Sequence, residues 1–228
     1  MISSLLPLLQ LCDSSFPSGA FSHSFGLETY IQEEQITDKN TFFQALSIYI
    51  NKQLVYTDGL ACRIAYEFLE SGSFSKLMEL DQLLFVSSLA NETRTGNRRV
   101  GSRMAKFCYD LYPSKNLEDY LTCMNKKEAY GHSSIVFAMV SHHLRVDTDT
   151  CVTAYLFAAV STLIQNGVRG IPLGQTDGQK LLVECQPHLT SAVSTINNLT
   201  IEDFGAVSPG LEIAQMKHES LHVRLFMS

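Results

Sequence analysis

The chain has 228 residues, of which 45% are hydrophobic and 18% are charged, and its formal net charge is -6. This composition permits a sizeable buried core and excludes a chain that is disordered by composition. The acidic balance disfavours nucleic acid binding through phosphates, and six scattered cysteines without a Cys-x-x-Cys pair favour reduced thiols over a disulfide framework.

The amino-terminal segment is rich in leucine but shows no targeting pattern. No basic region precedes it, and Pro7 interrupts it, which argues against a secretory signal. No apolar run approaches the ~20 residues that a membrane span requires. We therefore expect a soluble cytoplasmic protein that does not enter a membrane.

Hydrophobic residues recur with a helical period along most of the chain. In chain order, the apolar stripes fall in residues 42–50, 60–68, 77–84, 100–111, 136–144 and 152–164. Thr57 or Asp58 is placed to cap the start of the second stripe. Each stripe predicts one amphipathic helix.

Short breaks separate these stripes. They contain glycine, proline and serine and fall at 72–73, 113–114, 131, 167–174 and 205–210. Such breaks are too short to be linkers, and no series of alternating strand-like segments is apparent. The prediction is an all-α protein with a single globular domain over residues 1–228, built from roughly eight to ten packed helices.

Two segments depart from the helical rhythm. In the first, residues 13–28, Phe16 precedes Pro17 and is pushed out of the α region, while Ser18 and Gly19 suit the start of a new helix. In the second, residues 169–179, three glycines and one proline predict a tight bend between two apolar helices.

A basic cluster occurs between these segments at helical spacings. Its members are Arg94, Arg98, Arg99, Arg103 and Lys106. The favoured interpretation is a solvated helix face, because runs of charge alone are weak evidence of function. Binding of a negatively charged partner, either a protein or a nucleotide-bearing molecule, stays open.

The carboxy-terminal residues contain His218-Glu219-x-x-His222, which on a helix is the pattern of a zinc-dependent hydrolase. No usual zinc ligand follows His222, and a chain end offers a poor second shell. We keep the zinc hydrolase as the alternative and expect no metal site.

No catalytic constellation is apparent elsewhere. The sequence has no Gly-x-Ser-x-Gly and no Gly-x-x-x-x-Gly-Lys-Ser/Thr, so neither a serine nucleophile nor a phosphate loop is expected. The chain is therefore not expected to be an enzyme or to hold a cofactor.

Residues 218–228 also read as a short helical tail with apolar side chains on more than one face. Leu221 and Leu225 share one side, and Val223 and Met227 share another. A tail that is apolar around most of its girth must bury that surface. Two arrangements are equally consistent with these residues. The tail folds back on its own body, or it docks on a second protein, where Arg224 forms an ion pair.

Three long motifs in register resemble the urease accessory protein UreF family. The first is Asp-x-x-Phe-Pro-x-Gly-x-Phe/Tyr-x-His-Ser-x-Gly-Leu-Glu, in residues 13–28; the second is Pro-Leu-Gly-Gln-x-x-Gly-Gln, in residues 172–179; the third is the tail, in residues 218–228. The motif residues that we assign a structural role are Phe16, Pro17, Gly19, Gly26, Pro172, Gly174, Gln175, Gly178 and Gln179.

The resemblance implies an all-helical homodimer without catalytic activity. Proteins of this family bridge a UreD/UreH-type protein and the GTPase UreG, and the assembly delivers nickel to apo-urease. Whether the chain also regulates UreG, and which surface meets UreG, stay open.

By the same resemblance, residues from about 211 to 228 form a docking tail, and the segment from Gly19 to Glu28 is a nearby helix. The implied partner-binding residues are Phe21, His218, Glu219, Arg224, Leu225, Phe226, Met227 and Ser228. Some relatives have tyrosine where this chain has Phe21. His222 aligns with a position that is commonly tyrosine, which makes the zinc pattern accidental.

Overall fold

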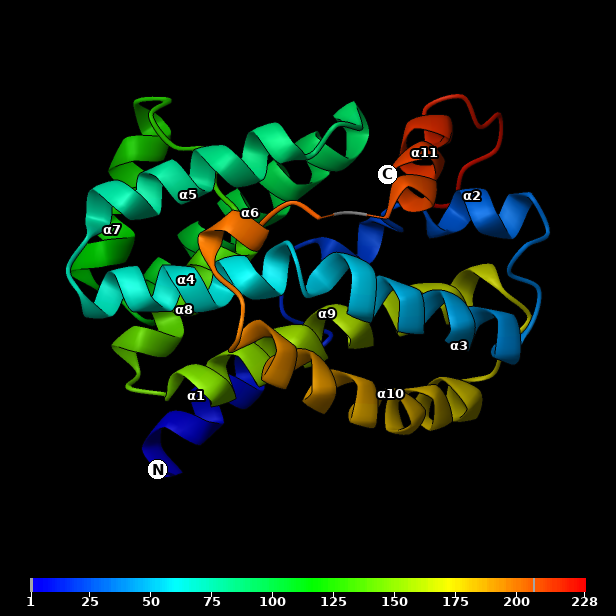
Figure 1. The fold of residues 1–228 in the computed structure, drawn as a ribbon, viewed down its shortest axis with the longest axis horizontal. Helices are drawn as coiled ribbons and strands as arrows, with labels where there is room; N and C mark the ends of the chain where they lie inside the picture. Colours follow the sequence, from blue (N-terminus) through cyan, green and yellow to red (C-terminus); the bar gives the residue numbers. More distant parts are fainter. Residues whose placement is uncertain (1, 207) are drawn as a thin grey trace.

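The computed structural model describes residues 2–206 and 208–228, and within them it contains helices and turns but no strand. The helices pack into one domain, as predicted (Figure 1). In chain order they are α1 (Ile2–Cys12), η1 (Ala20–Ser22), α2 (Leu27–Gln32), α3 (Lys39–Ile48), η2 (Tyr49–Leu54), α4 (Asp58–Glu70), α5 (Phe74–Ser87), α6 (Asn91–Leu111), α7 (Lys115–Asn125), α8 (Ser133–His143), α9 (Thr148–Gly170), α10 (Gln175–Ile196), η3 (Ile201–Asp203) and α11 (Pro209–His218).

Helix α9 is the central element. It contacts α1, α4, α8 and α10, and its predicted apolar stripe is buried, with Leu156 and Val160 fully enclosed. By length and hydropathy α9 is able to cross a membrane, but half of its most apolar window is buried inside the protein. Because core helices of this kind pass the same test, we read α9 as the core of the bundle.

The six cysteines are free thiols, as expected. Four of them, Cys62, Cys108, Cys151 and Cys185, are buried, and Cys12 and Cys123 are partly buried. Burial raises the pKa of Cys108 to about 12, which keeps that thiol protonated and unreactive.

The predicted helix from Gly19 to Glu28 is not continuous. It consists of the short 3-10 helix η1 and the start of α2, separated by left-handed residues at Phe25 (φ 52°) and Gly26 (φ 93°). A Cβ atom on Gly26 would lie 2.9 Å from the side chain of Gln215 on α11. The sharp turn therefore allows α11 to pack closely against the amino end of α2.

Two other local expectations differ from the structure. The break predicted at 167–174 starts only after Gly170, where α9 ends. Gly167 lies within α9, and a Cβ on it would lie 2.2 Å from the ring of Phe42, so glycine at this position allows Phe42 to pack directly on the helix. Thr57 occupies the N-cap position of α4 without capping it. Its hydroxyl oxygen lies 2.8 Å from the Gln53 carbonyl and 2.9 Å from an Asp58 carboxylate oxygen, and these two acceptors compete for its one hydrogen.

The predicted bend between α9 and α10 is shorter than residues 169–179. It covers residues 171–174, and the second half of the motif at 172–179 forms the first turns of α10. Within α10, a Cβ on Gly178 would lie 3.0 Å from Val168 of α9. In the first motif, the ring of Phe16 is buried and packs edge-to-face on Phe107 of α6, with ring centroids 5.4 Å apart. Gly178 and Phe16 therefore lie at contacts between elements.

The placement of α11 creates the candidate site. This helix packs against α2 and α6, which are far apart in the sequence. The carboxy-terminal residues then pass alongside α2 and return toward η1, so that the last residues of the sequence lie against residues 22–28, far from the amino-terminal end of α1 (Figure 1).

Candidate functional site

The tail after α11 is not helical. Helix α11 ends at His218, and residues 219–228 form turns, bends and irregular chain. The predicted helical tail is therefore wrong. The physical reason is that its main-chain groups find partners on α2 and η1: Gln32 donates to the Val223 carbonyl (2.5 Å), and the Met227 N–H donates to the Ser22 carbonyl (2.8 Å).

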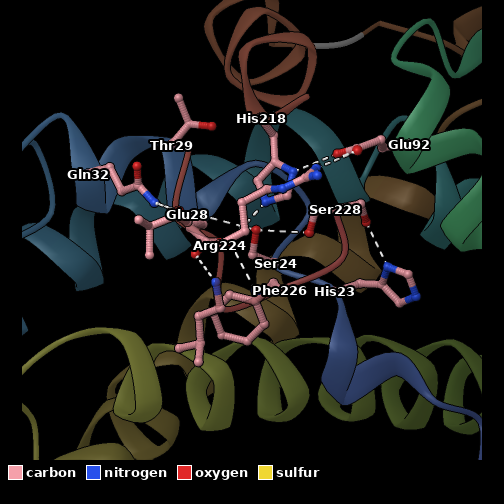
Figure 2. Close-up of polar contacts among 12 residues, drawn as sticks. His23, Ser24, Glu28, Thr29, Gln32, Glu92, His218, Arg224, Phe226 and Ser228 are labelled. Carbon is pink, nitrogen blue, oxygen red and sulfur yellow. Dashed lines mark hydrogen bonds and ion pairs between the residues drawn. The ribbon is translucent and has the colours of Figure 1, made fainter. Parts of the chain in front are cut away.

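His218 is the buried centre of this region (Figure 2). Its Nε2 lies 2.9 Å from a Glu28 oxygen on α2, and its Nδ1 lies 2.7 Å from a Glu92 oxygen on α6. Both ring nitrogens therefore face carboxylate oxygens, which are hydrogen-bond acceptors. The ring thereby joins α11 to two other helices.

Glu28 also holds the main chain of the tail. Its carboxylate accepts the N–H of Leu225 at 2.5 Å and the N–H of Phe226 at 3.1 Å, in addition to the His218 contact. Glu28 is a buried residue in the first turn of α2. Burying a carboxylate without hydrogen-bond donors would cost free energy of folding. The tail N–H groups and His218 supply these donors to Glu28.

Glu92 binds the tail from the opposite side. One of its oxygens accepts from Arg224 at 2.6 Å, while the other faces His218. Burial alone raises the pKa of Glu92, but the hydrogen bonds and charges of His218 and Arg224 outweigh it and lower that pKa below its ordinary value of 4.5. Glu92 is thus ionised at neutral pH.

The final residue lies in a small anion-binding turn. The Ser228 main-chain oxygen accepts the N–H groups of Ser24 (2.5 Å) and Phe25 (3.1 Å) and the Ser24 hydroxyl (3.0 Å). Successive N–H groups around a left-handed residue form a concave donor site, which explains the positive φ of Phe25.

The Ser228 hydroxyl forms a hydrogen bond with His23 Nδ1, with 2.7 Å between the two atoms. Burial, together with the charges of Arg99, Arg103 and His218, lowers the pKa of His23 from 6.5 to about 4. His23 is therefore neutral at neutral pH, which leaves one ring nitrogen free to accept a hydrogen bond.

Phe226 anchors the tail by apolar packing. It is 5% exposed, and the Arg169 guanidinium lies 5.1 Å from the centre of its ring. Arg169 also donates to the Phe21 carbonyl at 3.0 Å, which ties the tail to η1 through α9.

Exposed and buried side chains alternate over the last four residues of the tail. Phe226 and Ser228 face the body and are 5% and 1% exposed, whereas Val223, Leu225 and Met227 are 79%, 50% and 54% exposed. One set of side chains therefore anchors the tail, and the other faces solvent. We name Val223, Leu225 and Met227 the docking ridge.

The structure divides the residues for which partner binding was predicted. Phe21 is 57% exposed and lies beside the ridge, since the Met227 N–H bonds to the neighbouring Ser22. Leu225 and Met227 are on the surface, while His218, Phe226 and Ser228 are buried within the chain itself. The exposed Glu219 accepts the Glu92 N–H at 3.4 Å, and Arg224 pairs with Glu92.

Glu28, Glu92 and Gln32 were missed as site residues. Glu28 ends the first motif, which was the one available signal for it. Glu92 sits just before the basic cluster, and Gln32 lies in α2; neither carries a local pattern that distinguishes it from other surface residues.

The geometry does not support the zinc hydrolase. His222 lies beyond the end of α11, so the two histidines are not one turn apart on a helix, and both His218 nitrogens face carboxylates. Among residues 2–206 and 208–228, no cluster of three or more His, Cys, Asp or Glu residues is arranged to hold a metal ion.

The comparisons with known proteins agree with the motifs. A sequence model of the UreF family matches residues 36–186. Over 224 residues, which is 98% of this chain and 99% of the relative, the chain is 64% identical to the "Urease accessory protein UreF" of Bacillus sp. strain TB-90. The chain belongs to the UreF family.

Two further relatives carry the same description. The UreF proteins of Geobacillus kaustophilus and Lachnoclostridium phytofermentans are 56% and 51% identical over 224 residues, covering 98% of this chain and 98% of each relative. These alignments extend over nearly the whole chain, whereas the match to the family model ends before the tail. Membership of the UreF family makes this chain a urease accessory protein.

Proposed function

We propose that this chain is a non-catalytic scaffold for urease maturation. Its tail docks on a UreD/UreH-type protein, another face recruits the GTPase UreG, and the assembly inserts nickel into apo-urease. The scaffold works as a homodimer in the cytoplasm and holds no metal or cofactor of its own. Family membership supports the accessory role, and the docking ridge is the observation that carries the assignment of the tail.

The ridge suits a docking element because its anchoring and its binding surfaces are separate. Phe226, His218 and Ser228 hold the tail on the body, while Val223, Leu225 and Met227 remain exposed. Phe21 adds exposed apolar surface next to them, because its neighbour Ser22 bonds to Met227, and exposed apolar surface of this kind is typical of interaction sites. A segment that is already ordered loses less conformational entropy on binding than a free one.

Replacing the three ridge residues tests this assignment. The triple variant Val223→Ser, Leu225→Ser, Met227→Ser leaves the buried anchors in place, so we expect an unchanged fold and loss of co-purification with the UreD/UreH-type protein. The matched control is Val86→Ser, Val183→Ser, Ile201→Ser, which removes exposed apolar side chains from α5, α10 and η3. Undiminished binding by the ridge variant, at levels equal to the control, excludes the tail as the docking element.

A separate experiment addresses UreG. GTP turnover by UreG, measured with and without this chain and its UreD/UreH-type partner, distinguishes passive bridging from regulation. Unchanged turnover in a complex that still forms supports a scaffold only.

A further inference from the structure

Helix α6 carries an exposed basic surface that the fold does not use. Arg98, Arg99, Arg103 and Lys106 are all exposed, and none of them forms an ion pair within residues 2–206 and 208–228. No acidic residue occurs on this helix between Glu92 and Asp110. The protein has a net charge of -6, so this positively charged surface is opposite in sign to the chain as a whole.

Part of this surface faces the tail. Arg99, Arg103 and Lys106 are spaced i, i+4 and i+7, which places them on one side of α6. We name these three residues the basic face. Arg94 differs from them because its guanidinium packs over the ring of Phe85, 5.3 Å from the centroid.

The basic face adjoins the end of the tail. On the same helix, a Cβ on Gly96 would lie 2.8 Å from His23 and 3.1 Å from the Ser228 hydroxyl. A Cβ on Gly19, at the start of η1, would lie 2.4 Å from the Arg103 guanidinium. The charges of Arg99 and Arg103 also contribute to the low pKa of His23, which contacts Ser228. The end of the tail and the basic face therefore lie close together: His23 contacts Ser228, and the charges of Arg99 and Arg103 act on His23.

We propose that the docking ridge and the basic face form one continuous surface, and that the protein covering the ridge places carboxylates against Arg99, Arg103 and Lys106. This inference rests on the proposed function and adds the chemistry of the partner: an apolar groove flanked by acidic side chains. Arginine in such a position makes charge-assisted bonds to carboxylates and accelerates association.

A protein partner fits these observations better than a nucleic acid. Phe21 and Met227 are exposed apolar residues within two positions of Gly19 and Ser228, which approach α6, so a protein groove that reaches the basic face has apolar side chains to cover. Nucleic acid binding depends on many phosphate contacts over a broad positive surface, and the remainder of this chain is acidic.

Charge reversal on α6 provides the test. The double variant Arg99→Glu, Arg103→Glu is compared with Lys52→Glu, Lys126→Glu, which alters net charge equally at exposed positions on η2 and at the end of α7. Affinity for the UreD/UreH-type protein is measured at about 50 and about 500 mM NaCl. We expect the α6 variant to lose roughly tenfold or more at low salt and most of its salt dependence. The control should change less than about twofold, because distant exposed charges are largely screened.

Each outcome supports the inference or overturns it. If the ridge variant loses binding while Arg99→Glu, Arg103→Glu keeps wild-type affinity and salt dependence, the inference fails and the proposed function stands. If neither variant loses binding, both fail. If charge reversal weakens binding of UreG or of a single-stranded RNA oligonucleotide but not of the UreD/UreH-type protein, the continuous surface is excluded. Should the glutamate variant unfold, Arg99→Gln, Arg103→Gln replaces it, with the same direction of effect.

Discussion

The Glu28 carboxylate accepts the main-chain N–H of Phe226 at 3.1 Å, although the two residues are 198 positions apart in the sequence. The same carboxylate faces His218 and accepts the N–H of Leu225 (Figure 2). One buried acidic side chain thus fixes both the last helix and the tail. The orientation of the docking ridge depends on it.

Replacing Glu28 tests how far the tail relies on this carboxylate. Glu28→Gln removes the charge and replaces one acceptor oxygen with an NH2 donor, so three donors are left with a single neutral acceptor oxygen. We expect the free energy of unfolding to fall by about 2–3 kcal/mol, and amide hydrogens of residues 219–228 to exchange faster. The control Glu34→Gln, at an exposed position just after α2, should stay within about 0.5 kcal/mol of wild type. Equal effects of the two variants in urea unfolding would contradict the role of Glu28.

The alternation of the tail predicts opposite effects at neighbouring positions. Phe226→Ala removes a buried ring and its contact with Arg169, so we expect a loss of about 3 kcal/mol in unfolding free energy. Met227→Ala removes a side chain that is 54% exposed and should cost less than about 1 kcal/mol while weakening partner binding. A larger loss of stability at Met227 than at Phe226 in chemical denaturation would show that the register of the tail is wrong.

Gly96 provides a test of the contact between α6 and the end of the tail. Alanine normally stabilises a helix relative to glycine, but here its Cβ would lie 2.8 Å from His23 Nδ1. We expect Gly96→Ala to destabilise the fold by about 1–3 kcal/mol through overpacking and to displace Ser228. Gly174→Ala, where a Cβ has no neighbour within 4 Å, should change stability by less than about 1 kcal/mol. Thermal unfolding that ranks Gly96→Ala above wild type falsifies this packing.

The low pKa of His23 predicts how stability depends on pH. In the folded chain burial and the charges of Arg99, Arg103 and His218 hold this pKa at about 4, below its ordinary value of 6.5. Between these values the unfolded chain binds a proton that the folded chain does not. Stability is therefore full above pH 6.5 and falls as the pH drops toward 4, by up to about 3 kcal/mol from this residue.

The measurement compares wild type with His23→Asn, which keeps a polar atom near Ser228 but does not titrate. Urea unfolding at a series of pH values from about 7.5 down to about 5 should give a shallower pH dependence for the variant. Parallel pH profiles for the two proteins would show that His23 is not the group responsible.

The sequence predicted those features that depend on local pattern. The apolar stripe at 152–164 became the buried face of α9, and Pro172 and Gly174 lie in the bend before α10. Helical period and turn chemistry are properties of neighbouring residues, so they can be read without knowing the fold. The order of the three motifs, which can also be read without knowing the fold, indicated the family.

The conformation of the tail depends on contacts with residues that are distant in the sequence. Its spacing of apolar residues was compatible with a helix, yet it forms turns and bends because it bonds to Glu28 and Ser24, which lie 198 and 204 positions away from Phe226 and Ser228. Only the packing of α11 between α2 and α6 brings those groups together. The residues of this protein thus determined its helices and its family, whereas tertiary structure decided which tail side chains are anchors and which remain exposed. A buried carboxylate that needs donors competes for the tail's N–H groups, and no local pattern can reveal such a competitor.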